Sequence, residues 1–128
     1  MEQRCARILI IDDEEDICRY TRSMLQRTGR FEASATTDSK EGLALARKEP
    51  PDLILLDVNM PGMDGGDVAS ALAENDRTKD IPILFITALM KKAEESGESV
   101  GKHYYLAKPV NPTELVEKID TILKHSLK

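Results

Sequence analysis

The sequence predicts an α/β fold built on a parallel sheet of five strands. Short apolar runs and amphipathic segments alternate five times along the chain, which is typical of strand–helix–strand units with right-handed crossovers. Two of the runs, 8–11 and 53–56, are apolar throughout, as expected of strands that helices cover on both faces. These observations favour one domain, which we expect to span residues 1–128.

The five expected strands are short and end at polar residues or turn signals. They are expected at about 7–12, 31–36, 52–57, 81–86 and 103–107. The second strand alternates large or apolar with polar residues, which indicates a position at the edge of the sheet.

The first expected helix has one apolar face and a glycine at its end. We expect Ile17, Tyr20, Met24 and Leu25 to face the sheet and the helix to end near Gly29. The third helix, about 65–75, should turn Val68 and Leu72 inward, because residues four apart share a helix face.

The second and fifth helices begin with recognisable capping residues. Asp38, with Glu41 three residues later, predicts the start of a helix over about 39–48. Asn111 is the expected N-cap of the fifth helix, with Pro112 in its first turn. Its apolar stripe is expected to be Leu115, Val116, Ile119, Ile122 and Leu123.

The fourth helix, expected at about 89–100, is the weakest. It contains few apolar residues and a glycine, Gly97, so we expect it to be short or mobile.

Composition narrows the class of protein. A hydrophobic content of 41% and a charged content of 32% are typical of a folded globular domain, and the net charge of −5 argues against direct nucleic-acid binding. The sequence shows no secretory signal and no run long enough to span a membrane, so we expect a cytoplasmic protein without membrane contact. We expect Cys5 and Cys18 to be reduced and mostly packed, and His103 and His125 to be exposed.

Four strand ends carry side chains that could act together. Asp12 and Asp13 follow the first strand, Asp57 ends the third, Thr87 follows the fourth, and Lys108 follows the fifth. Open α/β sheets place their sites at the carboxyl ends of the strands. Three acids, a hydroxyl and an ammonium group at that edge suit a divalent cation and a phosphoryl group.

Each of these side chains also has a simpler interpretation. Asp12 and Asp13 could hold Mg²⁺ together with Asp57, and Asn59 could add its backbone carbonyl as a further ligand. Alternatively, the acids after the first strand could do no more than favour the N-terminus of the first helix. Asp57 could be a nucleophile toward phosphorus, or an ordinary residue of a strand-to-loop junction. A cis bond before Pro109 would turn the preceding lysine toward the strand ends.

Four motifs, each weak alone, are specific as a set. They are Ile-Ile-Asp-Asp-Glu at 10–14, Leu-Leu-Asp-Val-Asn-Met-Pro-Gly-Met-Asp-Gly at 55–65, Thr87-Ala88 and Lys108-Pro109. In this order and spacing the sequence resembles, over essentially its whole length, the receiver domain of two-component response regulators, in a stand-alone form like that of chemotaxis regulators. A receiver without an output domain fits either a complete protein or a part of a longer one.

The resemblance implies a doubly wound, flavodoxin-like (βα)5 fold with strand order 2-1-3-4-5. It implies that Asp57 takes a phosphoryl group from a histidine kinase or phosphotransfer protein. Mg²⁺ would be held by Asp13 and Asp57 directly and by Asp12 through water.

The same resemblance assigns the signalling roles. Lys108 would pair with the phosphoryl oxygens, Thr87 would hydrogen-bond one of them, and Tyr105 would be the switch aromatic. A downstream protein would dock on the face of the fourth helix, fifth strand and fifth helix. The protein would then be a switch that catalyses only its own phosphoryl transfer and slow dephosphorylation.

Rival functions fit less well. A haloacid-dehalogenase-type phosphatase needs an acid two residues after Asp57, where this chain has Asn59. A nucleotide- or flavin-binding module needs a glycine-rich turn after the first strand, where residues 12–16 are all acidic. A receiver fold that acts as an unphosphorylated interaction module remains the alternative.

Overall fold

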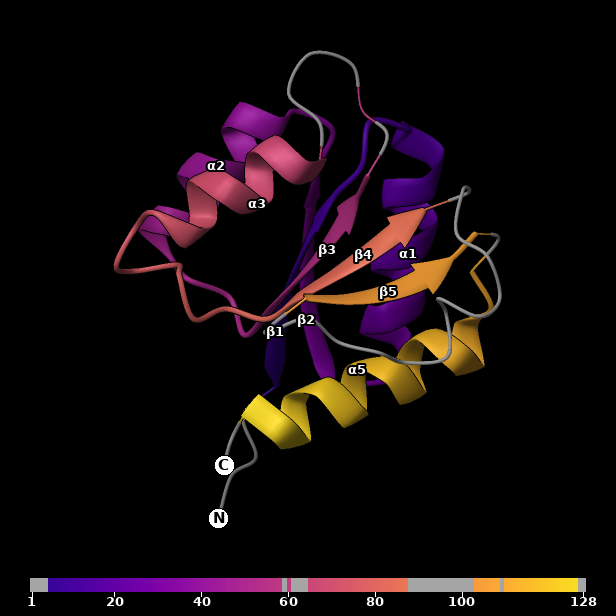
Figure 1. Ribbon diagram of the computed structural model, residues 1–128. Coiled ribbons are helices and arrows are strands. Elements are labelled where there is room, and N and C mark those ends of the chain that lie inside the picture. Colours follow the sequence, from indigo (N-terminus) through magenta and orange to yellow (C-terminus); the bar gives the residue numbers. More distant parts are fainter. Residues whose placement is uncertain (1–4, 59, 61–64, 88–102, 109, 127–128) are drawn as a thin grey trace.

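The protein forms one parallel sheet with helices on both faces (Figure 1). The computed structural model describes residues 5–58, 60, 65–87, 103–108 and 110–126. The strands are β1 (Ala6–Ile11), β2 (Phe31–Thr36), β3 (Leu53–Asp57), β4 (Ile83–Thr87) and β5 (His103–Ala107). All pairs are parallel and the order is β2-β1-β3-β4-β5, which confirms the predicted fold class and the edge position of β2.

Among the described residues, two helices cover each face of the sheet. Figure 1 shows α2 (Ser39–Lys48) and α3 (Gly65–Ala73) on one side, with α1 (Glu15–Arg27) and α5 (Pro112–Ser126) on the other. Because side chains of a strand alternate between faces, β1 supplies Ile8 and Ile10 to one core and Leu9 and Ile11 to the other. The first core also contains Leu25, Leu55, Leu84, Leu115, Ile119 and Ile122, and the second contains Leu43, Ile54, Leu56, Val68, Leu72 and Phe85.

The predicted helix starts are confirmed where the capping atoms are described. The Asp38 side chain accepts from the backbone N–H of Lys40 at 2.9 Å, and Asn111 Oδ1 accepts from the N–H groups of Thr113 and Glu114 at 2.9 and 3.1 Å. These bonds satisfy N–H groups that have no partner inside the helix.

The bond predicted from the Asp38 N–H to Glu41 in the capping box of α2 is replaced by two bonds through Thr36. The Asp38 N–H donates to the hydroxyl oxygen of Thr36 at 3.1 Å, and that hydroxyl donates to Glu41. Glu41 therefore supports the start of α2 through the end of β2.

A charged side chain covers part of the outer edge of β2. The carbonyl of Arg30 accepts from Ala6 in β1, and that of Thr36 accepts from Asp12 directly after β1. Alternation therefore turns the carbonyl of Ala33 away from β1. Arg22, from α1, donates its Nε–H to that outward carbonyl at 3.2 Å. One acceptor of the sheet edge is thus satisfied from within the molecule.

Two packing expectations were wrong. Tyr20 is 54% exposed, because α1 buries the face that carries Cys18, Thr21 and Leu25. Cys5 is exposed, whereas Cys18 is buried, and both are free thiols. Among the element boundaries, β4 begins and ends later than expected and α3 ends at Ala73.

Several expectations lie outside the described residues. They concern the helix over 89–100, the position of Asn59, the Lys108-Pro109 bond and the side chains of His103 and His125. Among the helices that the structure describes, none combines the length and apolar character that crossing a membrane requires.

Candidate functional site

The predicted site residues meet at the carboxyl edge of the sheet. Asp12 comes directly after β1, Asp57 is the last residue of β3, Thr87 is the last of β4, and Lys108 follows β5. Backbone bonds hold these ends together: the N–H of Val58 donates to the carbonyl of Ile86 at 3.1 Å, and that of Lys108 donates to the carbonyl of Thr87 at 2.9 Å. Parallel pairing therefore brings together four residues that are far apart in the sequence.

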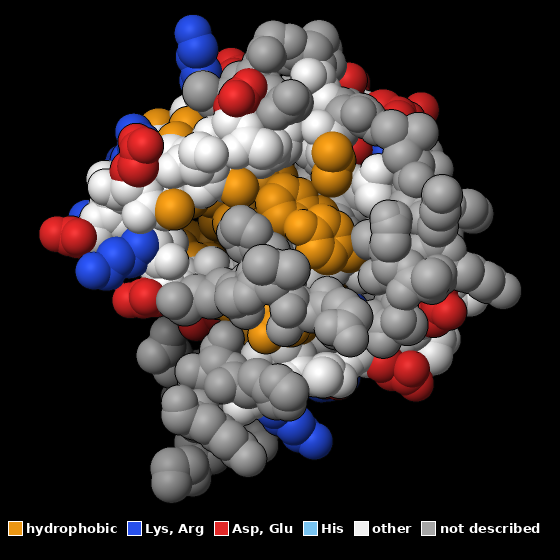
Figure 2. Space-filling model, viewed as in Figure 1, with side chains coloured by type: hydrophobic (Ala, Val, Ile, Leu, Met, Phe, Trp, Pro, Cys, Tyr) orange, Lys and Arg blue, Asp and Glu red, His pale blue; other side chains and the backbone are white. Residues whose placement is uncertain are grey.

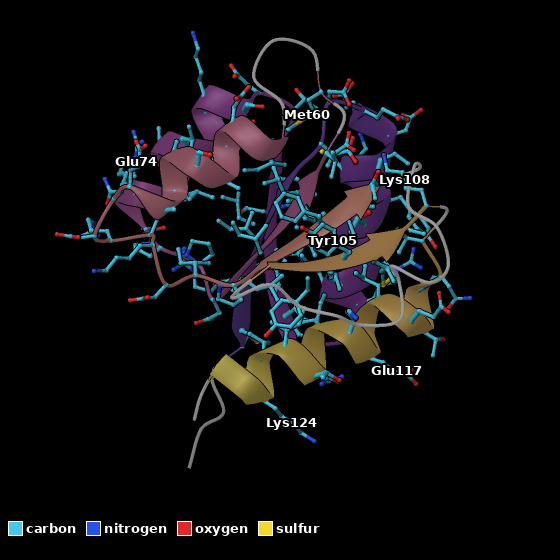
Figure 3. All side chains as sticks on the ribbon, viewed as in Figure 1. Met60, Glu74, Tyr105, Lys108, Glu117 and Lys124 are labelled. Carbon is cyan, nitrogen blue, oxygen red and sulfur yellow. The ribbon has the colours of Figure 1, made fainter. Side chains whose placement is uncertain are left out.

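Lys108 lies between the two buried acids. Its Nζ is 3.4 Å from Asp12 Oδ2 and 3.5 Å from Asp57 Oδ1, and both carboxylates are almost fully buried. Figure 3 shows Lys108 near the ends of β4 and β5, at the same end of the sheet as Met60. Burial alone would lower the pKa of Lys108, but the charges of Asp12 and Asp57 outweigh it and leave that pKa above its ordinary value. The lysine is therefore a cation at neutral pH.

The three acids could hold a divalent cation. One carboxylate oxygen from each of Asp12, Asp13 and Asp57 lies within 4.8 Å of the others, and Asp13 is exposed whereas the other two are buried. Mg²⁺ prefers oxygen ligands and commonly keeps several waters, which one exposed acid and two buried acids would allow. The donor set therefore fits Mg²⁺.

The turn after β1 is fixed by bonds around Asp12. Its N–H donates to the carbonyl of Thr36 at 3.2 Å, and its Oδ1 accepts from the N–H of Glu14 at 2.9 Å. Its own carbonyl accepts from the thiol of Cys18 at 3.2 Å. Burial, with a further contribution from the charge of Asp12, raises the pKa of Cys18 to about 11, so the thiol keeps its proton at neutral pH.

The first residue of α3, Gly65, lies very close to Asp57. The N–H of Gly65 donates to the carbonyl of Val58 at 3.0 Å. A Cβ at Gly65 would lie 2.8 Å from the backbone oxygen of Asp57 and 2.9 Å from Val58 Cα. The site thus requires glycine here because the backbone at the start of α3 lies directly against the end of β3.

Tyr105 and Thr87 lie on the same face of the sheet. Tyr105 pairs with Phe85 in the β4–β5 register, and the two rings stack with centroids 5.2 Å apart. Thr87 is two residues beyond Phe85, so strand alternation places it on that face as well. Figure 2 shows hydrophobic side chains in the middle of this view, where Figure 3 labels Tyr105.

Two contributors to the site were not identified from the sequence. The sequence predicts no site role for Glu14, yet its Oε2 lies 3.9 Å from Lys108 Nζ. Gly65 ends the motif at 55–65, and no contact is predicted for it from the sequence. The role of Gly65 could have been suspected from its position at the junction of a loop and a helix, because glycines there often allow close approach of the backbone.

Comparison with known proteins shows the family to which this chain belongs. A family model described as "Response regulator receiver domain" matches residues 8–120. The chain therefore belongs to the receiver domains of two-component response regulators, a class of signalling domains. The chemotaxis protein CheY4 of Vibrio cholerae has a similar structure: TM-score 0.82 and 32% identity, covering 93% of this chain and 99% of that one.

Sequence relatives are longer than this chain. The transcriptional regulatory protein PcoR of Escherichia coli is 37% identical over 121 residues, which are 94% of this chain and 52% of PcoR. The probable transcriptional regulator ycf27 of Porphyra purpurea is 35% identical over 127 residues, or 98% of this chain and 51% of that protein. The chain thus spans about half the length of these curated relatives.

Proposed function

We propose that this receiver domain accepts a phosphoryl group on the carboxylate of Asp57 in a reaction that depends on Mg²⁺. The observation that carries the proposal is the position of Lys108 Nζ, 3.4 Å from Asp12 and 3.5 Å from Asp57. A phosphoryl group on Asp57 would lie beside a cation already held in place by a second acid. Membership of the receiver family supports the same assignment.

The side chains divide the chemistry between them. An oxygen of Asp57 would attack phosphorus, and the Lys108 ammonium would pair with the phosphoryl oxygens. The Thr87 hydroxyl, at the end of the neighbouring strand, would donate to one of these oxygens. Because Asp57 and Thr87 are only 4% and 6% exposed, the reacting group would meet few competing waters.

The metal would be held by the acids of the site. Asp12, Asp13 and Asp57 form the candidate cluster, and we retain the backbone carbonyl of Asn59 as a proposed ligand. A bound Mg²⁺ would screen the repulsion between the Asp57 carboxylate and the incoming anion.

We propose that the phosphorylated state is read by proteins. Withdrawal of Thr87 toward Asp57 would change the space next to Tyr105, which lies on the same face of the sheet. The affected surface would include β5, α5 and residues 89–100, where a downstream protein would dock. The phosphodonor would be a histidine kinase or a phosphotransfer protein, and residues 1–128 would form one receiver domain in the cytoplasm.

Asp57→Asn tests the proposal. The wild type and the variant are incubated with phosphoramidate, with and without Mg²⁺, and the added phosphoryl group is located by mass spectrometry of peptides. We expect Mg²⁺-dependent labelling of Asp57 and none in the variant, whose amide has nearly the same volume but is a poor nucleophile. A wild type that binds its partner and resists every donor would instead favour the unphosphorylated interaction module.

A further inference from the structure

Glu14 turns its carboxylate toward the site and away from the helix that it precedes. It occupies the N-cap position of α1 but makes no side-chain capping bond there. Its Oε2 lies 3.9 Å from Lys108 Nζ, and its side chain is 61% exposed. The carboxylate therefore belongs to the rim of the site and can meet a molecule that approaches from solvent.

The backbone of Glu14 is held in place while its side chain points outward. Its N–H donates to Asp12 Oδ1 at 2.9 Å, and its carbonyl accepts from the N–H of Cys18 at 3.1 Å. These two bonds hold the backbone of Glu14 to Asp12 and to α1. The turn itself thus fixes the backbone that carries this side chain next to Lys108.

The charges around Lys108 are unequal. Asp12, Asp57 and Glu14 all lie within 4.0 Å of its ammonium group, and Asp13 completes the acid cluster. Four carboxylates therefore face one ammonium among these residues. A bound cation would offset much of the charge of the cluster, but Glu14 lies outside it and keeps its charge at the rim.

We propose that Glu14 selects among phosphodonors by opposing the most negatively charged ones. It competes with the donor's phosphoryl oxygens for Lys108 and repels the donor as it approaches. The repulsion is larger for a dianion than for a monoanion. The residue therefore favours nitrogen-linked phosphoryl donors over acyl phosphates, and this inference rests on the proposed phosphorylation of Asp57.

Acetyl phosphate and phosphoramidate are two small phosphodonors that differ in net charge near neutral pH. With acetyl phosphate, a dianion near neutral pH, an Asp57 oxygen bonds to phosphorus while the bond from phosphorus to the acetyl oxygen breaks, and acetate leaves with that electron pair. With phosphoramidate, whose protonated nitrogen makes it a monoanion, the phosphorus–nitrogen bond breaks and ammonia leaves with the pair. Both reactions give the same aspartyl phosphate.

The test compares Glu14→Gln with Glu15→Gln. The control removes the same charge one residue away, where the carboxylate pairs with Arg19 at 3.2 Å on the surface of α1. Initial rates of labelling are measured by intact-mass spectrometry with each donor, at an Mg²⁺ concentration shown by titration to saturate each variant. We expect Glu14→Gln to raise the acetyl phosphate rate relative to the phosphoramidate rate by about three- to fivefold at low ionic strength.

Salt and geometry provide further readouts. The effect of Glu14→Gln on the ratio of the acetyl phosphate rate to the phosphoramidate rate should vanish at about 1 M salt, where the Debye length is about 3 Å. Glu15→Gln should leave this ratio near that of the wild type. An NMR contact between the Hγ protons of Glu14 and the Hε protons of Lys108 should be seen without any donor.

Each contrary result has a distinct meaning. An unchanged donor ratio in Glu14→Gln, an equal change in Glu15→Gln, or absence of the NMR contact would overturn the role of Glu14 alone. A wild type that neither donor labels would overturn the proposed function, and with it this inference.

Discussion

Gly65 and Asp57 are in direct backbone proximity: a Cβ built on Gly65 would lie 2.8 Å from the carbonyl oxygen of Asp57. The obstacle is backbone, so it cannot be relieved by a change of rotamer. Any other residue at position 65 must move either the start of α3 or the end of β3, where the proposed nucleophile lies.

The first prediction follows from this contact. Gly65→Ala should slow phosphorylation of Asp57 by roughly tenfold or more, because misplacement by a fraction of an ångström removes the alignment of the reacting atoms. The control is Gly66→Ala, at the neighbouring exposed glycine of α3, which should keep the wild-type rate. The phosphorylation rates of the two variants are compared after each is divided by the fraction of folded protein, which urea unfolding gives. Equal rates in the two variants would show that α3 absorbs the added methyl group.

The second prediction concerns metal binding. Asp13→Asn should weaken Mg²⁺ binding by roughly tenfold, because it removes the exposed charge of the acid cluster. Asp16→Asn, an exposed acid in the first turn of α1, serves as the matched control and should change the affinity little. Amide chemical shifts followed during a titration with Mg²⁺ give the dissociation constant of each variant. An unchanged titration in Asp13→Asn would remove this residue from the proposed site.

The third prediction uses the raised pKa of Cys18. The ordinary value of 9.0 applies to the unfolded chain and about 11 to the folded one, so the folded state holds the proton more tightly. Both states are protonated below pH 9, and above that pH the unfolded chain loses its proton first. The free energy of unfolding should therefore fall as pH rises from about 9 to about 11.

Cys18→Val isolates that effect, because valine has no titrating group. The difference in unfolding free energy between wild type and variant should shrink or reverse across the same pH window, as measured by urea unfolding followed by circular dichroism. Lys108 also loses its favourable ion pairs at high pH, but it does so in both proteins. A constant difference from pH 8 to 11 would contradict the assigned pKa.

The fourth prediction tests the core beneath α1. Leu25→Ala should lower the free energy of unfolding by about 2 to 5 kcal/mol, because the side chain is fully buried and its removal leaves a cavity. Leu45→Ala, on α2, is the same change at a position that is 40% exposed and should cost much less. Similar losses would mean that the Leu25 site collapses around the smaller residue.

The strand ends were predictable because parallel pairing leaves them only one place to meet. Asp12, Asp57, Thr87 and Lys108 could be assigned to one edge once the strands were recognised, and the structure brings all four there. The exposure of Tyr20 was not predictable from spacing alone. It depends on the rotation of α1 about its axis, which its tertiary contacts determine.

The contacts of Glu14 and Gly65 were not predictable from the sequence for a different reason. Glutamate is not among the preferred N-cap residues, but nothing in the sequence indicates that the Glu14 side chain approaches Lys108 instead. The close approach of Gly65 depends on how the start of α3 packs against the end of β3.

The bond from Arg22 to the carbonyl of Ala33 has a consequence for assembly. An uncovered edge strand offers its carbonyl groups to a strand of another molecule, and that route leads to aggregation. An added strand beside β2 would first have to displace a guanidinium group anchored on α1. The same helix that covers one face of the sheet therefore also hinders the addition of a further strand at the β2 edge.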